Sequence, residues 1–226
     1  MTTTSNPSTG ATSDRTEEES MQCAWKDLQY EELAELQYAA AQAKKGENDD
    51  HQLTQLIQKI IQHFQDYTNN HLLLSFVSRT CSVAWTSTLV SLISFKGKRE
   101  LTSKQMNMID ALQAKTIKQE KILTSKLASL QEDIVDQPIA SKIKNEMGEC
   151  GNADEALDEH DRHMAGIMEE ADELRMETLK EIVLNILKPI QAVEYLEAAK
   201  RMRLCFGKWG EKRDQQHANK LELSVD

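Results

Sequence analysis

Apolar residues recur every three or four positions along much of the chain, which is the spacing of helices that bury one face. The clearest stripe lies within residues 50–74, and a later one alternates steps of three and four in the manner of a heptad. Such stripes are stable only when other helices cover them, so the pattern predicts an all-α fold, a bundle of long antiparallel helices. The first stripe comprises Leu53, Leu56, Ile57, Ile60, Ile61, Phe64, Tyr67, His71 and Leu74, and the later one Leu157, His160, Met164, Ile167, Ala171, Leu174 and Thr178.

Breaks in the pattern set the expected boundaries. Residues 1–20 are rich in Thr, Ser, Gly and Pro and are predicted to form a disordered N-terminal tail. A turn at Gly46 separates the first two helices, and Pro138 limits the third. Helices are expected from Met21 to Gly46, across 53–74, from 101 to 133, from 153 to 187, and from Pro189 to about Trp209, with a short helix within 76–99.

Two helix starts carry local signals. Thr102 can cap the third helix while Gln105 reaches back to it, and Leu101 can pack on Met106. Pro189 suits the first turn of the last helix, because its missing N–H is not needed there. These signals predict helix starts at both places.

The length, net charge and cysteine count of the chain narrow the possible classes of function. The chain has 226 residues and a formal net charge of −10, which argues against binding nucleic acid directly, since that needs clustered Lys and Arg. Four distant cysteines without a C-x-x-C pair do not support a zinc or redox motif. The sequence has no apolar run of about 18 residues and no N-terminal signal pattern. An intracellular protein that contacts no membrane is therefore expected.

Catalytic and metal-binding patterns are weak. There is no G-x-S-x-G elbow, and the carboxylates follow solvated helix faces, so we expect no enzymatic activity and no catalytic residues. His160 and His163 lie near Asp158, Glu159 and Asp161 and resemble a metal cluster. The competing interpretation places His160 within the heptad-like apolar stripe and His163 in solvent. We therefore expect no bound metal.

The segment KRMRLCFGKWG, residues 200–210, concentrates cations beside apolar residues. It is expected to be the end of a packed helix, with Leu204 and Phe206 in the core and Trp209 closing the bundle. The cations would then favour the negative end of the helix dipole and pair with the acidic face of the preceding helix. They are Lys200, Arg201 and Arg203.

Five segments carry motifs that are specific in combination: W-K-D-L-Q from Trp25, residues 56–67, A-W-T-S from Ala84, and the blocks 101–140 and 171–204. Together they resemble the plant Delay of Germination (DOG) family, whose domain also follows the zipper of TGA-type bZIP transcription factors. The last two blocks are most similar to stand-alone seed-dormancy members. The resemblance divides the chain into a tail of residues 1–20, a domain of residues 21–214 and a polar tail of residues 215–226.

The resemblance implies a non-catalytic regulator of seed dormancy and germination in the nucleus and cytoplasm. It would restrain type 2C protein phosphatases of abscisic acid signalling through Trp25, Asp27 and Leu28. The competing interpretation is that Trp25 and Leu28 only cover the bundle. A transcription-regulatory module working with a TGA-like bZIP partner, a sensor of haem or an acyl chain, and a homo-oligomer remain open.

Two departures from the family pattern qualify these expectations. The apolar segment that usually follows the tryptophan turn is shortened around residues 86–100. The resemblance implies two haem-ligating histidines in some members, and their positions correspond here to Arg203 and Gly207, neither of which can ligate iron. Cys205 could offer a thiolate, but it is expected to be a small residue on a buried helix face. No cofactor is therefore expected.

Overall fold

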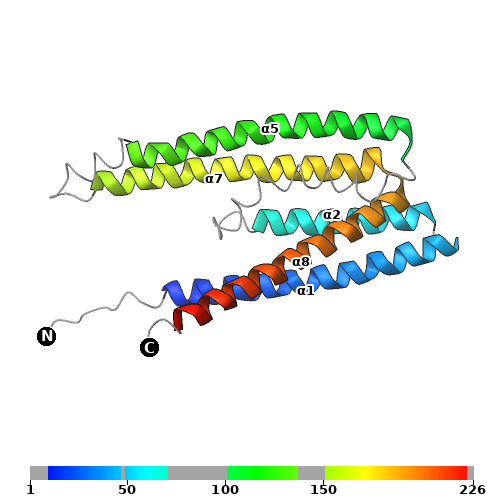
Figure 1. Ribbon diagram of the computed structural model, residues 1–226, viewed down its shortest axis with the longest axis horizontal. Coiled ribbons are helices and arrows are strands. Elements are labelled where there is room, and N and C mark those ends of the chain that lie inside the picture. Colours follow the sequence, from blue (N-terminus) through cyan, green and yellow to red (C-terminus); the bar gives the residue numbers. More distant parts are fainter. Residues whose placement is uncertain (1–9, 47–48, 71–100, 137–150, 223–226) are drawn as a thin grey trace. The chain divides into compact units, whose positions relative to one another are not determined.

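The computed structural model describes residues 10–46, 49–70, 101–136 and 151–222, and these are almost entirely helical, with no strand among them (Figure 1). The all-α prediction is confirmed. The chain divides into two compact units, one of residues 1–60 with 193–226 and one of residues 61–192. The elements are α1 (Gly10–Lys45), α2 (Asp50–Asn70), α5 (Ser103–Asp136), α7 (Gly151–Lys180), a π-helix η1 (Glu181–Ile186) and α8 (Pro189–Glu222).

Two helices extend beyond the bounds that the pattern predicted. Helix α1 begins at Gly10, so the part of the expected disordered tail from residue 10 to 20 is helical. Helix α8 continues to Glu222, through most of the expected polar tail. The extension of α8 is explained by propensity, because residues 211–222 are rich in good helix formers such as Glu, Lys and Gln. The predicted short helix within 76–99 and the shortened segment around 86–100 lie outside the described residues.

The first unit contains α1, the start of α2 and most of α8. Gly46, with φ of 77°, closes the end of α1 in a left-handed conformation that glycine adopts without strain. Lys59 of α2 pairs with Glu35 of α1 at 2.8 Å, and Lys44 of α1 pairs with Glu194 of α8 at 3.1 Å. The most deeply buried core residues of this unit, each at most 3% exposed, include Leu36, Leu53, Ile57, Ile60, Val193 and Leu196.

The second unit is built on the antiparallel pair α5 and α7. Lys126 pairs with Glu170 at 2.6 Å and Lys115 with Glu177 at 4.0 Å, so one helix ascends as the other descends. Apolar side chains of both helices form one buried cluster, which confirms most of the predicted seam of α7. The cluster comprises Leu123, Leu130, Met164, Ile167, Met168 and Ala171.

The start of α5 is fixed by the predicted capping box. The Gln105 N–H donates to the Thr102 hydroxyl at 3.2 Å, and the Thr102 N–H donates to the Gln105 side chain at 3.0 Å. The Gln105 amide also donates to the Ile186 carbonyl and to the Gln191 side chain, both at 2.8 Å. One buried glutamine therefore caps α5 and holds it to the junction between η1 and α8.

The π-helix replaces the end of the predicted helix 153–187. The Leu187 N–H donates to the Ile182 carbonyl at 3.0 Å, a five-residue step. Leu187 is extended (φ −88°, ψ 149°), so the helical backbone ends two residues before Pro189. Helix α8 then begins at Pro189, which confirms the predicted start.

Thr116, in the middle of α5, is 1% exposed, and its hydroxyl has no hydrogen-bond partner within the described part of the chain. Burying an unsatisfied hydroxyl is unfavourable. We expect Thr116→Val, which keeps the shape, to stabilise the protein by up to about 1 kcal/mol. Urea unfolding of the two proteins checks this, with the exposed Thr124→Val as control, and a loss of more than about 1 kcal/mol would show that the hydroxyl is bonded.

Tyr195 of α8 is buried, and burial raises the pKa of its phenol above the usual 10.0. Above pH 10 the unfolded chain releases this proton while the folded protein keeps it, so stability falls as pH rises, by up to about 1.4 kcal/mol per pH unit. We expect Tyr195→Phe to make the decline between pH 9.5 and 11 shallower than in the parent, as measured by urea unfolding. If the free energy of unfolding fell equally steeply with pH in both proteins, Tyr195 would not be the origin of the alkaline sensitivity.

Candidate partner-binding surface

The three predicted partner-binding residues lie on α1. Asp27 is exposed, whereas Trp25 and Leu28 are half-buried. The guanidinium of Arg203, on α8, lies 5.8 Å from the centre of the Trp25 ring, which is a cation–π arrangement. Trp25 therefore contacts a neighbour on α8 and keeps part of its surface exposed near the exposed carboxylate of Asp27. The structure contains no partner chain, so the binding role of these residues stays a prediction.

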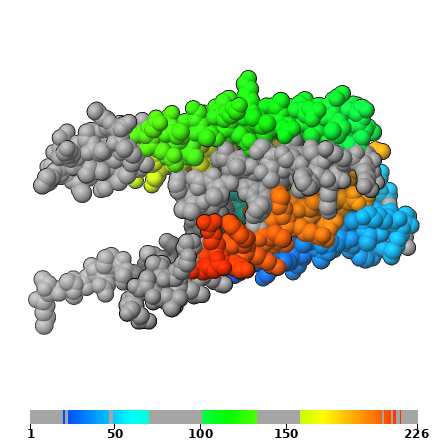
Figure 2. All heavy atoms as spheres, viewed as in Figure 1, coloured from blue at the N-terminus to red at the C-terminus, as the bar shows by residue number. Residues whose placement is uncertain are grey.

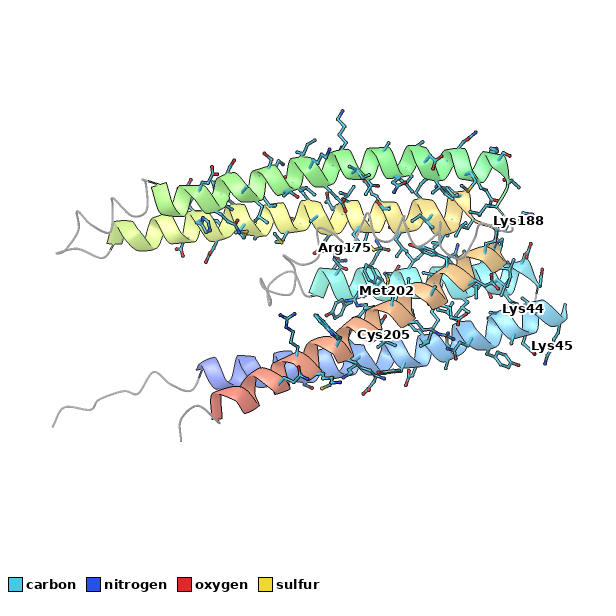
Figure 3. All side chains as sticks on the ribbon, viewed as in Figure 1. Lys44, Lys45, Arg175, Lys188, Met202 and Cys205 are labelled. Atoms are coloured by element: carbon cyan, nitrogen blue, oxygen red, sulfur yellow. The ribbon has the colours of Figure 1, made fainter. Side chains whose placement is uncertain are left out.

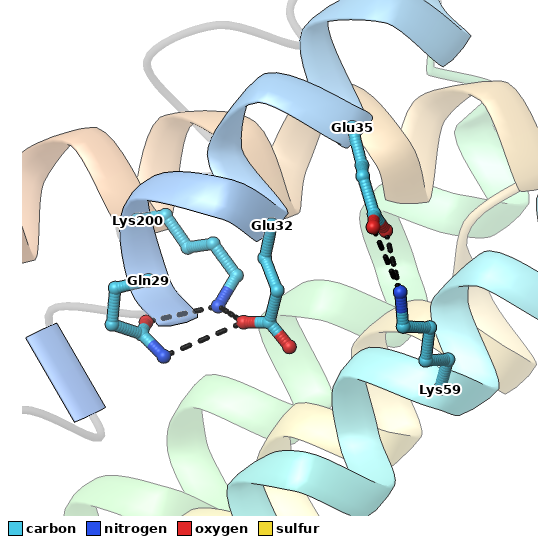
Figure 4. Close-up of polar contacts among 5 residues, drawn as sticks. All are labelled: Gln29, Glu32, Glu35, Lys59 and Lys200. Carbon is cyan, nitrogen blue, oxygen red and sulfur yellow. Dashed lines mark hydrogen bonds and ion pairs between the residues drawn. The ribbon is translucent and has the colours of Figure 1, made fainter. Parts of the chain in front are cut away.

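A buried polar network holds α1 to α8 next to this site (Figure 4). The Lys200 ammonium donates to the Gln29 side chain at 2.9 Å and pairs with Glu32, and the Gln29 amide donates to the same carboxylate at 3.4 Å. Lys200 is 7% exposed and Glu32 1%. Burial lowers the pKa of Lys200, and the Glu32 carboxylate partly opposes that shift. The three side chains fix which face of α1 meets α8.

One predicted role of the cations in KRMRLCFGKWG was wrong. Because α8 continues to Glu222, Lys200, Arg201 and Arg203 lie well before its end, where the helix dipole has little effect. Two of these cations pair within the first unit. Lys200 pairs with Glu32 of α1, and Arg201 pairs with Glu197 one turn earlier at 2.7 Å.

Two expected core positions in the same segment are exposed. Trp209 is 60% exposed and does not close a bundle. Cys205, labelled in Figure 3, is exposed rather than on a buried face. Leu204 is half-buried, and the side chain of Phe206 lies outside the described part. The segment contains too few apolar positions at helical spacing to define an inward face, which is why its register was misjudged.

Two further ring contacts were missed by the sequence analysis. The Lys208 ammonium lies 5.4 Å from the centre of the Tyr30 ring, and the Arg213 guanidinium lies 5.3 Å from the Trp209 ring. Trp209 and Arg213 are four residues apart on one helix, so their contact could have been predicted from the sequence. The first joins α1 to α8 and depends on their mutual register, which the sequence does not reveal.

The family's haem positions do not fit haem here. Arg203 is engaged with the Trp25 ring, and neither it nor Gly207 supplies a ligand atom for iron. For metals, His160 is half-buried and His163 exposed, and no group of three or more potential ligands lies together among the described side chains. The described helices include none that is both long and apolar enough to cross a membrane.

The second unit has a shallow groove of about 700 Å³ between α5 and α7. Its rim mixes charges, since Lys126 and Glu170 pair across it while Arg162 and His163 line it. Ile122 and Leu130 provide a small apolar part. An open groove of mixed charge does not favour one ligand class, and it gives no specific support to an acyl-chain site.

Comparison with known proteins finds three relatives in Arabidopsis thaliana. The chain is 30% identical to Protein DOG1-like 3 over 241 residues, which cover 85% of this chain and 83% of that protein. It is 41% identical to Protein DOG1-like 1 over 128 residues and 39% identical to Protein DOG1-like 2 over 105 residues. These two matches cover 55% and 46% of this chain, and 44% and 39% of the relatives. No protein-family model matches the chain.

Proposed function

Because the chain belongs to the plant DOG1-like family, which is related to seed dormancy, we propose that it is a regulatory protein that acts by binding other proteins and not by catalysis. The match to Protein DOG1-like 3 confirms the family resemblance drawn from the five segments. The proposed mechanism is supported by long helices with charged exteriors.

The proposed partners are type 2C protein phosphatases of abscisic acid signalling, which the protein would restrain. The observation that carries this proposal is the setting of Trp25. Its ring is oriented by Arg203 and remains partly exposed next to Asp27. Tryptophan is frequent among the residues that dominate binding energy, and an anchor that is already oriented loses less entropy on binding. Leu28, one turn along α1, would extend the apolar contact.

Binding of the full chain to a purified seed type 2C phosphatase tests the proposal by calorimetry. We expect Trp25→Ala to weaken binding by about 2 kcal/mol, or roughly thirtyfold, as for a central anchor. Since this change also removes the contact with Arg203, the exposed Asp27→Lys serves as a second variant that leaves the packing intact. We expect it to reduce the association rate.

The matched control is Tyr38→Ala, which removes an aromatic residue of α1 that is 67% exposed. It should bind like the parent protein. Helix content by circular dichroism should be the same for all variants. Unchanged affinity for both Trp25→Ala and Asp27→Lys would exclude this surface, and a parent protein that fails to bind any type 2C phosphatase would exclude the proposed partner.

The remaining expectations stay predictions. A role with a TGA-like bZIP partner requires that the purified pair form a complex, which size-exclusion chromatography would detect. The same measurement on the protein alone tests for a homo-oligomer. A nuclear and cytoplasmic location follows from the proposed partners, and fluorescence imaging of the tagged protein in seed cells would check it.

A further inference from the structure

The second half of α8 carries four exposed residues that lie on one side of the helix. Lys208, Trp209, Lys212 and Arg213 are all exposed, and their spacing places them within one side of the helix. We call this group, together with Tyr30 of α1, the α8 cationic face. Figure 2 shows the described atoms of this part of α8, in orange and red, at the surface turned towards the viewer.

The cations of this face form no ion pair with any carboxylate whose side chain the structure describes. Elsewhere, Lys44, Lys59, Lys126 and Lys200 each pair with a carboxylate. Within the described part of the chain, Lys208, Lys212 and Arg213 have no ion pair with a carboxylate, although the whole chain carries a net charge of −10. The face is thus a local positive surface on an acidic protein.

Two of these cations are oriented by aromatic rings. Lys208 lies over Tyr30, which is 36% exposed, and Arg213 lies over Trp209, which is 60% exposed. A guanidinium that stacks on a ring keeps its N–H donors in the plane available to a carboxylate. The exposed part of Trp209 offers an apolar contact at the same place. The face therefore combines positioned donors with an aromatic anchor.

We propose that the α8 cationic face binds an acidic segment of another protein. Carboxylates of that segment would pair with Lys208, Lys212 and Arg213, and an apolar side chain would pack on Trp209. This site goes beyond the proposed function, since it involves different residues and does not depend on the identity of the partner bound at Trp25.

A polypeptide fits this surface better than a nucleic acid or a membrane. Charges are screened over about 8–10 Å at physiological ionic strength, so a short segment senses only the local cations. A nucleic acid extends beyond them and meets the acidic remainder of the protein. Three cations also fall below the clusters of about 4–8 that bind anionic membranes.

The direct test uses a fluorescein-labelled peptide of alternating Glu and Leu, with a second peptide that carries Gln in place of Glu. We expect fluorescence anisotropy to show binding of the Glu peptide that weakens with added salt, and little binding of the Gln peptide. Charge reversal by Lys208→Glu, Lys212→Glu and Arg213→Glu together should reduce affinity at least about tenfold. Trp209→Ala, at an exposed position, should reduce it about fivefold.

The matched control reverses three exposed cations of α5, through Lys104→Glu, Lys118→Glu and Lys121→Glu, with the same change in net charge. It should bind the Glu peptide within about twofold of the parent. An equal loss in the control would overturn the proposal, as would equal binding of the Gln peptide, or tighter binding of single-stranded DNA or phosphatidylserine vesicles. The Trp25 variants are tested for binding to the phosphatase, whereas the variants of the α8 cationic face are tested for binding to the peptides. Failure of one proposal is therefore distinguishable from failure of the other.

Discussion

Lys200→Met is expected to destabilise the unit that contains α1 and α8 by about 3–5 kcal/mol, because it leaves the Glu32 carboxylate buried without its cation. The cost of burying both charges has already been offset by their attraction and by the contact with Gln29. Removing one partner loses that attraction and keeps the desolvation of the other. Urea unfolding followed by circular dichroism measures the difference.

The double variant Lys200→Met with Glu32→Leu supplies the control. Replacing both charges with apolar side chains of similar size removes the uncompensated carboxylate, so we expect most of the lost stability to return. The conservative Lys200→Arg should fall between the two, since a guanidinium keeps the charge and alters the geometry. A loss of less than about 1 kcal/mol in Lys200→Met would mean that the pair behaves like an exposed one.

Gln105→Glu is expected to cost about 2–4 kcal/mol in the unit that contains α5 and η1. A glutamate still accepts the hydrogen bond from the Thr102 N–H, so the cap of α5 is preserved. It cannot donate to the Ile186 carbonyl or the Gln191 side chain, and it places a carboxylate oxygen against two other oxygens. The variant thus separates the long-range contact from the cap.

Two further variants serve as comparisons for the unfolding of Gln105→Glu. Gln105→Ala removes both the cap and the long-range contact, whereas Gln119→Ala changes an exposed glutamine of the same helix and should be neutral within about 0.5 kcal/mol. If Gln105→Glu unfolds at the same urea concentration as the parent, the cap alone accounts for the role of Gln105. A pH series adds a check, because protonation of the new carboxylate at low pH should restore part of the stability.

The sequence was most informative where structure depends on nearby residues. The Thr102–Gln105 cap and the start of α8 at Pro189 are local patterns, and both are confirmed. The apolar stripe of α2 is confirmed from Leu53 to Tyr67, while His71 and Leu74 lie outside the described residues. The seam of α7 is confirmed at Met164 and Ile167 because a heptad-like repeat is itself a packing pattern.

The sequence was less informative where structure depends on the register between helices. The contacts of Lys200 with Glu32 and of Gln105 with Ile186 join residues separated by 168 and 81 positions, and no periodicity marks them. The π-helix at the end of α7 also escaped prediction, since its residues have ordinary helix propensity and only the approach of Pro189 distinguishes them. Trp209 was predicted to close the end of the bundle, whereas it is 60% exposed among charged neighbours.

The burial of Lys200 has a practical use. Amine-acylating reagents should modify the exposed Lys208 and Lys212 of the native protein rapidly, while Lys200 stays protected until α1 and α8 separate. Mass spectrometry of the tryptic peptides would then follow one shielded amine against two accessible ones on the same helix. The acylation rate of Lys200 in the unmutated protein thereby reports how often these two helices separate. The rate can be measured with and without a bound partner.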